Sequence, residues 1–431
     1  MEGSGAPPGK RLLVLGAGPA QLGLLQAARG RGLFVIALDR DPAAPGLQYA
    51  DRRAIISTED ERGIERLAEA ERVDGIIAPG IDWPVAIAAR VAEKLRLPHP
   101  LDPATAGLAT SKLRQRERLA EGGVPQPRWK LVGEPDDELG FPCVVKAPDR
   151  QGQKGLSLVR DAAELRGAVA RAIAESRGGM ALIEELVDGP EVTVNAFSVR
   201  GEFHPLTVTD RLTAEPPAFG VALAHVWPAR SARPRSGPVE GVRGNREVPP
   251  TEEQRSINDV IRVAQAAAEA LGIENGPTYT QIRVGPDGPQ VMELAARLGG
   301  GHDAELVQAA LGVDLNGLAI AAALGEPLWS AAVRGEPQVG GACTRFLVPP
   351  EGELRAVEGV EEARSREGIL EIRVYREPGH VFGPFLRGAD RAGAVLAVGE
   401  TREEALERAD HAASLIRFQV SGARALAQKG G

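Results

Sequence analysis

The sequence predicts an α/β and α+β protein that begins with a parallel sheet and ends with a small separate domain. Two observations carry this prediction. Apolar runs of strand length alternate with helical segments across residues 10–103, which is the pattern of βαβ units. From about Gly335, short strands and one closing helix replace that pattern. A chain of 431 residues also exceeds what one compact core usually holds.

The first domain, residues 1–103, is predicted to be a Rossmann-like parallel-sheet domain. Arg11–Gly16 and Phe34–Asp39 are apolar strand runs, and Pro19–Arg29 between them has a helical pattern. Gly75–Ala78 begins a further strand. A proline-bearing segment at residues 97–103 closes this region.

The middle region, residues 104–334, mixes helices with short strands. A helical stretch is expected at Ala104–Glu121, strands around Trp129 and at Cys143–Lys146, Ala181–Glu185 and Glu191–Val199, and a polar hairpin at Asp149–Ser157. Asp161 is placed to cap the helix that follows. The last region, residues 335–431, has strands at Ala342–Val348, Ile369–Tyr375 and Ala394–Val398 and a helix opened by Thr401. These patterns predict three domains.

Composition excludes several classes of protein. A net charge of −8 argues against a nucleic-acid binder or a polybasic membrane adaptor. The two cysteines lie far apart and the six histidines are scattered, which indicates neither a disulfide framework nor a zinc cluster. No apolar run reaches the length of a membrane span, and the first residues lack the core of a signal peptide. We expect a cytoplasmic protein without nucleic-acid or membrane partners.

The turn after the first strand is a weak dinucleotide signal. Gly16 and Gly18 fit the G-x-G-x-x-G pattern, but Gln21 stands where the third glycine belongs. Asp39 at the end of the second strand is placed to hold a ribose. A nicotinamide-dependent oxidoreductase therefore remains an alternative, beside a plain strand–turn–helix that forms an anion site.

Two lysines and a glycine loop suggest a polyphosphate site in the middle region. Lys112 lies near the start of a helix, and Lys146 ends an apolar strand just before the Gly152–Gly155 loop. Ammonium groups and backbone N–H donors can together enclose a triphosphate. Either lysine alone is usually a solvated surface charge, but Lys146 continues an apolar strand, where a charge needs a partner.

Acidic residues follow at two further places. An edge strand ending in Glu184 and Glu185 precedes a Gly-Pro turn and Glu191, which suits backbone contacts to adenine and carboxylate contacts to ribose; a hairpin with solvated acids is the other interpretation. Glu293 ends a strand four residues before Arg297, and three glycines follow Leu298. A carboxylate suits Mg²⁺ and a guanidinium suits phosphate.

Taken in order, these motifs resemble the ATP-grasp superfamily. Within it, the chain is similar to carboxylate–amine ligases of the L-amino-acid (dipeptide) ligase type, because of the stretch Leu306–Gly325 and the last domain. The resemblance implies an ATP-grasp domain of two α+β subdomains over residues 104–334, an L-amino-acid-ligase-like domain over 335–431, and a homodimer. It implies that ATP phosphorylates a carboxylate and that an amine then displaces phosphate.

The resemblance also implies roles for single residues. ATP would be bound by Lys112 and Lys146 at the phosphates, by Gly152, Gln153 and Gly155 in the closing loop, by Glu184, Glu185 and Val187 at adenine, and by Glu191 at the ribose. Glu293 would bind Mg²⁺ or Mn²⁺, Arg297 would steady the acyl phosphate, and Arg211 would reach the γ-phosphate.

Two positions depart from the family's pattern. Gln281 stands where an acidic metal ligand is usual, and Ala295 where asparagine is common. Glutamine offers Mg²⁺ a carbonyl oxygen without charge, and alanine offers nothing. Gln281 therefore stays a metal-ligand candidate, and Asp303 and Glu305 lie nearby in the sequence as other oxygen donors.

The expected substrates are a small-molecule carboxylic acid and an amine, most naturally amino acids. Candidate residues for the substrate cleft are Asp82, Trp83, His225, Trp227 and His302, although each aromatic could instead belong to the core. Besides the nicotinamide-dependent oxidoreductase, two other functions compete with the ligase. One is a carboxylase-like enzyme that activates bicarbonate, and the other is a nucleotide-binding protein whose catalysis is weakened at Gln281 and Ala295.

Overall fold

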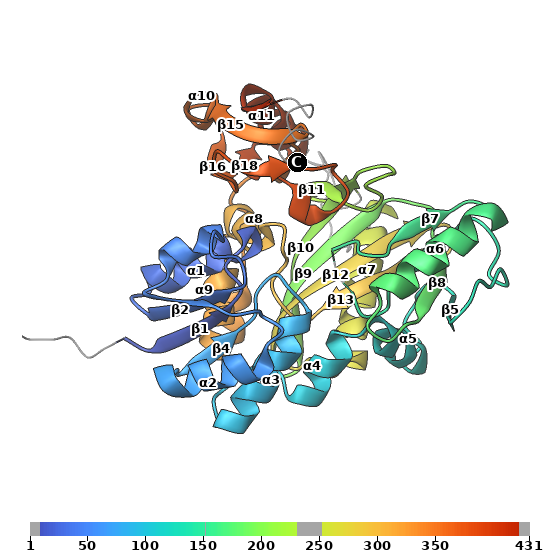
Figure 1. Cartoon of the computed structure of the whole chain (residues 1–431), viewed down its shortest axis with the longest axis horizontal. Helices are drawn as coiled ribbons and strands as arrows, with labels where there is room; N and C mark the ends of the chain where they lie inside the picture. Colours follow the sequence, from blue (N-terminus) through green and yellow to red (C-terminus); the bar gives the residue numbers. More distant parts are fainter. Residues whose placement is uncertain (1–8, 151, 231–251, 422–431) are drawn as a thin grey trace, which may run out of the picture.

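The computed structural model of the chain describes residues 9–150, 152–230 and 252–421, whose strands form four sheets. In Figure 1 the N-terminal part (blue) lies on the left, the middle of the chain (green to yellow) on the right, and the C-terminal part (red) above both.

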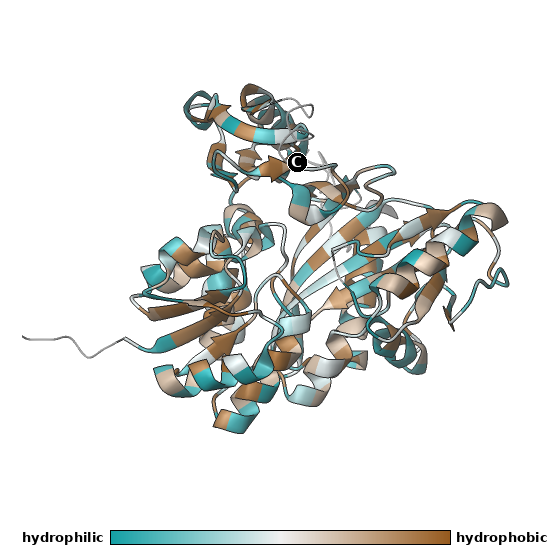
Figure 2. Ribbon diagram, in the orientation of Figure 1, coloured by the Kyte–Doolittle hydropathy of each residue, from teal (hydrophilic) through white to brown (hydrophobic). Residues whose placement is uncertain are grey.

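The N-terminal sheet is parallel, as predicted. Its order is β3 (Arg52–Ile55), β2 (Phe34–Asp39), β1 (Arg11–Leu15), β4 (Gly75–Ile77), and helices α1 (Leu22–Gly30), α2 (Glu61–Glu71) and α3 (Trp83–Leu95) flank it. The central strands are hydrophobic along their length, as Figure 2 shows, because both faces of such a sheet are covered. The helix predicted from Pro19 begins as a 3₁₀ turn, Pro19–Gln21, and becomes α-helical only at Leu22.

The helical stretch predicted at Ala104–Glu121 is two helices, α4 (Pro103–Ala109) and α5 (Lys112–Glu121). Asp102 caps α4, and Ser111 caps α5 by accepting a hydrogen bond from the backbone of Arg114. A serine that caps a second helix ends the first one. The break places Lys112 in the first turn of its own helix.

A small antiparallel sheet carries the glycine-bearing hairpin. Its order is β5 (Trp129–Val132), β8 (Ala181–Glu185), β6 (Cys143–Lys146), β7 (Ser157–Val159). Helix α6 (Ala162–Glu175), capped by Asp161 as predicted, covers one face. The core between them is formed by apolar side chains such as Val145, Leu165 and Val169.

The largest sheet has eight strands and runs through two of the predicted domains. Its order is β13 (Gly288–Ala295), β12 (Gly276–Gly285), β9 (Glu191–Val199), β10 (Glu202–Thr213), β11 (Ala222–Trp227), β14 (Gly341–Leu347), β18 (Gly393–Gly399), β16 (Ile369–Val374). The pairing of β11 with β14 crosses the predicted boundary at residues 334 and 335. Helix α7 (Glu252–Ala270) packs beside β13.

The remaining elements complete the C-terminal part. They are β15 (Gly352–Glu358), α10 (Val360–Arg364), β17 (Val381–Phe382), α11 (Arg402–Leu415) and β19 (Arg417–Ser421), with 3₁₀ turns at Pro45–Tyr49, Ser330–Val333 and Gly388–Asp390. Thr401 caps α11, as expected.

Helices α8 (Asp303–Leu311) and α9 (Leu315–Ala323) join distant parts of the sequence. Leu306 and Ile320 share one hydrophobic core with Leu12 and Leu24 of the N-terminal domain, although they lie far later in the chain. Contacts between distant segments thus cross both predicted domain boundaries. The division into residues 1–103, 104–334 and 335–431 stays a prediction.

No helix among the described residues is long and apolar enough to cross a membrane. Cys143 and Cys343 are both buried free thiols.

Candidate functional site

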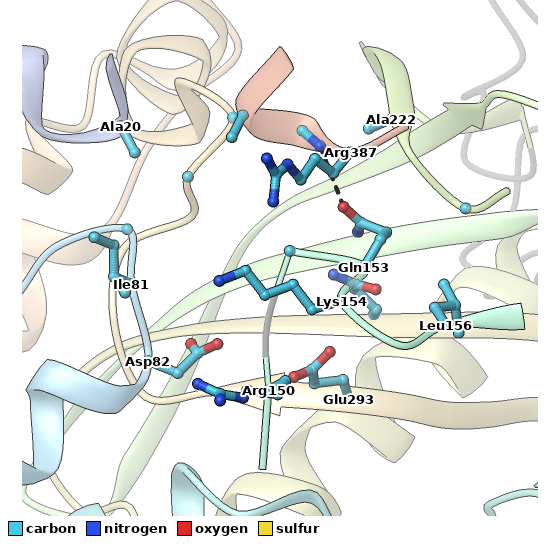
Figure 3. A pocket seen from close by; sticks show the side chains of 18 of the residues that line it. Ala20, Ile81, Asp82, Arg150, Gln153, Lys154, Leu156, Ala222, Glu293 and Arg387 are labelled. Carbon is cyan, nitrogen blue, oxygen red and sulfur yellow. Dashed lines mark hydrogen bonds between the residues drawn. The ribbon is translucent and has the colours of Figure 1, made fainter. Parts of the chain in front are cut away.

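One cavity of about 670 Å³ collects the residues singled out in the sequence. Its walls come from the N-terminal sheet, the glycine-bearing hairpin, the eight-stranded sheet and the C-terminal part, and Figure 3 shows side chains from all of them around one space. The predicted site residues that line it are Lys112, Lys146, Gly152, Gln153, Glu184, Glu185, Val187, Glu191, Arg211, Gln281, Glu293 and Arg297. Gly155 lies in the same loop but does not line the cavity.

Lys146 and Glu184 form a buried ion pair in the wall of the cavity. Lys146 Nζ lies 2.6 Å from Glu184 Oε2, and Arg116 Nε lies 2.7 Å from Glu184 Oε1. Burial lowers the pKa of Lys146 to about 8, although Glu184 opposes this shift. Burial raises the pKa of Glu184, but the charges of Arg116 and Lys146 outweigh it and bring the value to about 2. The partner that Lys146 was expected to need is therefore Glu184.

Glu293 pairs with the other predicted phosphate ligand. Lys112 Nζ lies 2.6 Å from Glu293 Oε1 and donates to the backbone carbonyl of Arg150 at 2.7 Å. Gln281 of β12 is the direct cross-strand neighbour of Glu293 on β13. The two metal-ligand candidates therefore stand side by side on adjacent strands.

Glu191 holds two arginines at the start of β9. Its carboxylate lies 2.7 Å from Arg211 Nη1 and 3.4 Å from Arg283 Nε. Arg211 also donates to the carbonyl of Gly220 at 3.0 Å. Arg211 and Glu191, the predicted ribose ligand, therefore contact each other.

The glycine loop has the backbone conformation that its sequence suggested. Gly152, Gln153 and Gly155 have φ angles of 65°, 63° and 69°, in the left-handed region that favours glycine. The Gln153 side chain accepts a hydrogen bond from the backbone of Gly388 at 3.3 Å, so the loop contacts the C-terminal part (Figure 3).

Arg297 reaches across the cavity to the N-terminal domain. Its Nε lies 2.6 Å from Asp82 Oδ1, and its guanidinium carbon lies 5.5 Å from the centre of the Tyr279 ring. Figure 3 shows Asp82 and Glu293 on opposite sides of the lower part of the cavity. Arg297 therefore holds one wall to the other.

The donor set of the cavity fits a nucleotide polyphosphate. The buried Nε atoms of Arg211 and Arg391 have no hydrogen-bond partner among the described residues, so an anion in the cavity would satisfy them. Glu293 and Gln281 present two oxygen donors, which suits Mg²⁺ completed by phosphate oxygens and water. Among the residues described, no three His, Cys, Asp or Glu side chains are arranged to hold a metal by themselves.

The residues suggested for the substrate cleft separate into two groups. Asp82 and His225 line the cavity. Trp83 instead stacks under Arg177 at 3.9 Å, and Trp227 packs against an apolar core. His302 is buried in contact with Tyr375 and Arg373.

The other oxygen donors are engaged away from Glu293. Asp303 accepts hydrogen bonds from His225 and from the backbone of Gly301, and Glu305 pairs with Arg373 at 3.1 Å. At the N-terminal turn, Gln21 donates to the carbonyl of Pro79 at 2.6 Å and fills the space beneath Gly16.

Sequence reasoning missed two arginines and one ion pair in and behind the cavity wall. Arg116 follows Lys112 by one helical turn, and that i, i+4 spacing was an available signal. Arg391 from the C-terminal part lines the cavity with its guanidinium 3.7 Å over Phe346 and no acidic partner in the described chain. The Asp303 partner of His225 was missed because nothing in the local sequence brings residues 78 positions apart together.

Comparisons with known proteins agree with this architecture. Residues 345–421 match the family model "L-amino acid ligase C-terminal domain 2". The crystal structure of an L-amino acid ligase from Bacillus licheniformis covers 97% of this chain and 100% of its own, with a TM-score of 0.78 at 21% identity. N5-carboxyaminoimidazole ribonucleotide synthetase from Thermotoga maritima covers 96% and 100%, with a TM-score of 0.70 at 23% identity. The ATP-grasp fold expected from the sequence is thereby confirmed.

Sequence relatives extend over nearly the whole chain. A formate-dependent phosphoribosylglycinamide formyltransferase of Burkholderia lata is 28% identical over 431 aligned positions, covering 96% of both chains. An uncharacterized protein of Sinorhizobium fredii is 27% identical over 417 positions, covering 92% of this chain and 80% of the relative.

Proposed function

We propose that this protein is an ATP-dependent carboxylate–amine ligase that forms an amide or dipeptide bond through an acyl phosphate and releases ADP and phosphate. One observation carries the proposal. The same cavity is lined by two lysines that each pair with a glutamate, by the glycine loop, by Glu293 beside Gln281, and by Arg297, which spans the cavity. That donor set supplies what phosphoryl transfer to a carboxylate needs, namely positioned cations around the transferred group.

Each charged group has a part in the proposed reaction. Lys112 and Lys146 offset the phosphate charge and are held in place by Glu293 and Glu184. The Gly152–Gly155 loop covers the polyphosphate with its backbone donors. Arg297 lies on the side facing the N-terminal domain, where it steadies the acyl phosphate.

The roles at the nucleoside end belong to the same proposal. Glu184, together with the backbone of Glu185 and Val187, reads adenine, and Glu191 reads the ribose. Arg211 reaches the γ-phosphate with the Nε that its contacts to Glu191 and Gly220 leave unpaired.

Magnesium or manganese bound at Glu293 and Gln281 would offset charge on the polyphosphate. Because Lys112 Nζ contacts Oε1 of Glu293, Oε2 would remain for the metal ion, and Lys112 would stay beside the polyphosphate. The neutral Gln281 reduces the negative charge at this site relative to two carboxylates.

An ADP- and phosphate-release assay with Mg²⁺ or Mn²⁺, over carboxylic acids and amines singly and in pairs, tests the proposal. We expect release that requires both an acid and an amine, and a fall of about 10² or more in kcat for Glu293→Ala and Arg297→Ala. Arg118→Ala is the matched control, since Arg118 forms an exposed pair with Glu121 away from the cavity lining. ATP binding without turnover over the whole panel would favour the nucleotide-binding alternative instead.

A second candidate acid comes from the sequence relatives. The similarity to a formate-dependent formyltransferase covers 96% of both chains, which favours formate as a carboxylate to include. Bicarbonate belongs in the same panel, because one structural neighbour is a biotin carboxylase domain solved with bicarbonate. If ADP release depends on formate or bicarbonate and needs no amino acid, the protein uses one of these two acids and is not a dipeptide ligase.

Three further expectations belong to this proposal. They are amino acids as the two substrates, a homodimer, and a cytoplasmic location. Light scattering of the purified chain tests the dimer directly.

A further inference from the structure

His225 is a cavity residue to which the proposed reaction gives no role. It lies on β11 with 2% of its surface exposed, and it lines the cavity. Its Nδ1 lies 2.9 Å from Asp303 Oδ1. Among the hydrogen bonds of the described residues, none involves the other ring nitrogen, Nε2.

Asp303 fixes which nitrogen of His225 carries the proton. Burial raises the pKa of Asp303, but the His225 ring and the hydrogen bonds from Gly301 and Asn195 bring it to about 2. An ionised carboxylate only accepts hydrogen bonds, so Nδ1 donates to Asp303 and Nε2 keeps its lone pair. The assignment follows from the hydrogen-bond network.

His225 stands among the groups that the proposed reaction uses. Arg211 is its cross-strand neighbour on β10. The Tyr279 ring stacks on it with centroids 6.4 Å apart, and Arg297 lies over the same tyrosine. Phe346 covers its edge at 5.8 Å, and Arg391 lies over Phe346. The titratable and charged groups that face the ring are therefore Asp303, Tyr279, Arg211 and Arg391.

The other basic candidates in the cavity are already engaged. Its six lining carboxylates accept from backbone N–H groups or cations: Asp39 from Ala17, Asp82 from Arg297, Glu184 from Lys146, Glu185 from Arg128, Glu191 from Arg211 and Glu293 from Lys112. Carboxylates are weaker bases than a neutral imidazole, and His225 is the one histidine among the described residues that line the cavity.

We propose that His225 is the general base that deprotonates the ammonium group of the incoming amine so that it can attack the acyl phosphate, and that Asp303 is its positioning residue. The inference rests on the proposed ligase function. The amine nitrogen forms a bond to the acyl carbon, and the bond from that carbon to the phosphate oxygen breaks, with its electron pair leaving on phosphate. Before attack, Nε2 of His225 takes one proton from the ammonium group and later releases it to solvent, and the second N–H proton, lost as the bond to carbon forms, is taken up by the departing phosphate.

The test compares two amines in His225→Gln and Asp303→Asn. An amino acid is an ammonium ion at neutral pH and needs a base, whereas hydroxylamine is largely unprotonated and traps the acyl phosphate as a hydroxamate. We expect His225→Gln to lower amide formation by about 10² to 10⁴, while its hydroxamate formation stays within about threefold of wild type because acyl-phosphate formation needs no base. Asp303→Asn keeps the imidazole ring but lets the other tautomer form, so its rate of amide formation should lie between those of wild type and His225→Gln.

A matched variant distinguishes a base from a structural residue. His411→Gln, at an exposed site on α11, is the control and should keep both rates.

Three results would overturn the inference. Equal losses with both amines in His225→Gln would place the residue in phosphoryl transfer or in folding, and ATP affinity with thermal unfolding would separate these. An unchanged rate of amide formation in His225→Gln would show that His225 is not the general base. A wild-type enzyme that forms neither amide nor hydroxamate from ATP and any acid would contradict the ligase itself, and the base with it.

Discussion

Glu184 is the most constrained charge in the cavity wall. It lies between Arg116 and Lys146, and Arg116 additionally donates to the carbonyls of Val291 and Met292, each at 2.7 Å. A carboxylate that neutralises two buried cations is costly to remove, because each cation then stays buried without its counter-charge.

We therefore expect Glu184→Gln to lower the free energy of unfolding by about 3–5 kcal/mol. Urea denaturation at neutral pH measures the change. Glu121→Gln, which removes an exposed pair with Arg118, is the control and should cost less than about 1 kcal/mol. A loss of similar size in both variants would mean that the Glu184 pairs contribute no more than surface pairs.

Gln281 decides how much negative charge the metal site has. Because it faces Glu293 across adjacent strands, Gln281→Glu would bring two carboxylates together. We expect the variant to need about tenfold less Mg²⁺ for half-maximal ADP release, since carboxylate charge tightens the binding of hard cations.

Without metal, the same Gln281→Glu variant should unfold more easily than wild type, because like charges on adjacent strands repel. Denaturation with and without Mg²⁺ checks this. An unchanged Mg²⁺ requirement would show that Gln281 does not lie in the metal site.

At the scale of elements, the sequence predicted those strands and helices whose patterns are local. Strands β1 and β2 of the N-terminal sheet are continuous apolar runs, whereas β3 (RRAI) is not and was not predicted. Asp161 and Thr401 mark the starts of their helices. The glycine loop and Lys146 were also identified, because strand and turn are adjacent in the chain. Strands β10 and β11 were not predicted, and their register is what brings Arg211 beside His225. Pairings of this kind depend on contacts between distant segments, which a local pattern does not encode.

The turn between β8 and β9 sets the position of Glu191. Gly189 there has a φ of 145°, and a side chain on it would place its Cβ 2.1 Å from the carbonyl oxygen of Val284. We expect Gly189→Ala to displace the turn, to lower stability by more than about 2 kcal/mol, and to weaken ATP binding through Glu191.

Calorimetry of ATP binding and urea denaturation measure the two effects of Gly189→Ala. Gly201→Ala is the matched control, since Gly201 also has a positive φ, 82°, but open space around it. It should cost only about 1 kcal/mol and leave ATP affinity unchanged. Equal effects in the two variants would argue against a role for the close approach to Val284.

At the scale of the whole molecule, Arg373 joins three parts of the chain. Its guanidinium contacts Glu305 and His302 at the start of α8, Gln26 of α1, and Glu371 on its own strand. His302 also contacts the hydroxyl of Tyr375. The three predicted domains could be read from composition and pattern, but these links could not, because each residue looks like an ordinary surface charge in its own segment.

This cluster gives the protein a pH dependence. Burial lowers the pKa of His302 from 6.5 to about 4, so the folded chain keeps it neutral where the unfolded chain protonates it. The stability due to this histidine is therefore complete above pH 6.5 and is lost as the pH falls toward 4. Between pH 7 and pH 5 the loss should be about 2 kcal/mol.

Urea denaturation at both pH values checks this, with His302→Gln as the comparison. The variant should have a smaller stability difference between pH 7 and pH 5 than wild type. Identical differences would show that His302 is protonated equally in the folded and unfolded chains.

The hydrogen bonding of β11 to β14 has a consequence for anyone who would exchange the last third of the chain for that of a relative. A chimera joined at residue 335 would divide one continuous sheet, since Ala224 to Trp227 pair with Ala342 to Arg345. The incoming segment would have to reproduce this edge in register, and His225 lies on it. A chimera that keeps β11 together with its partner strand β14 would preserve the cavity wall, whereas one joined at residue 335 would not.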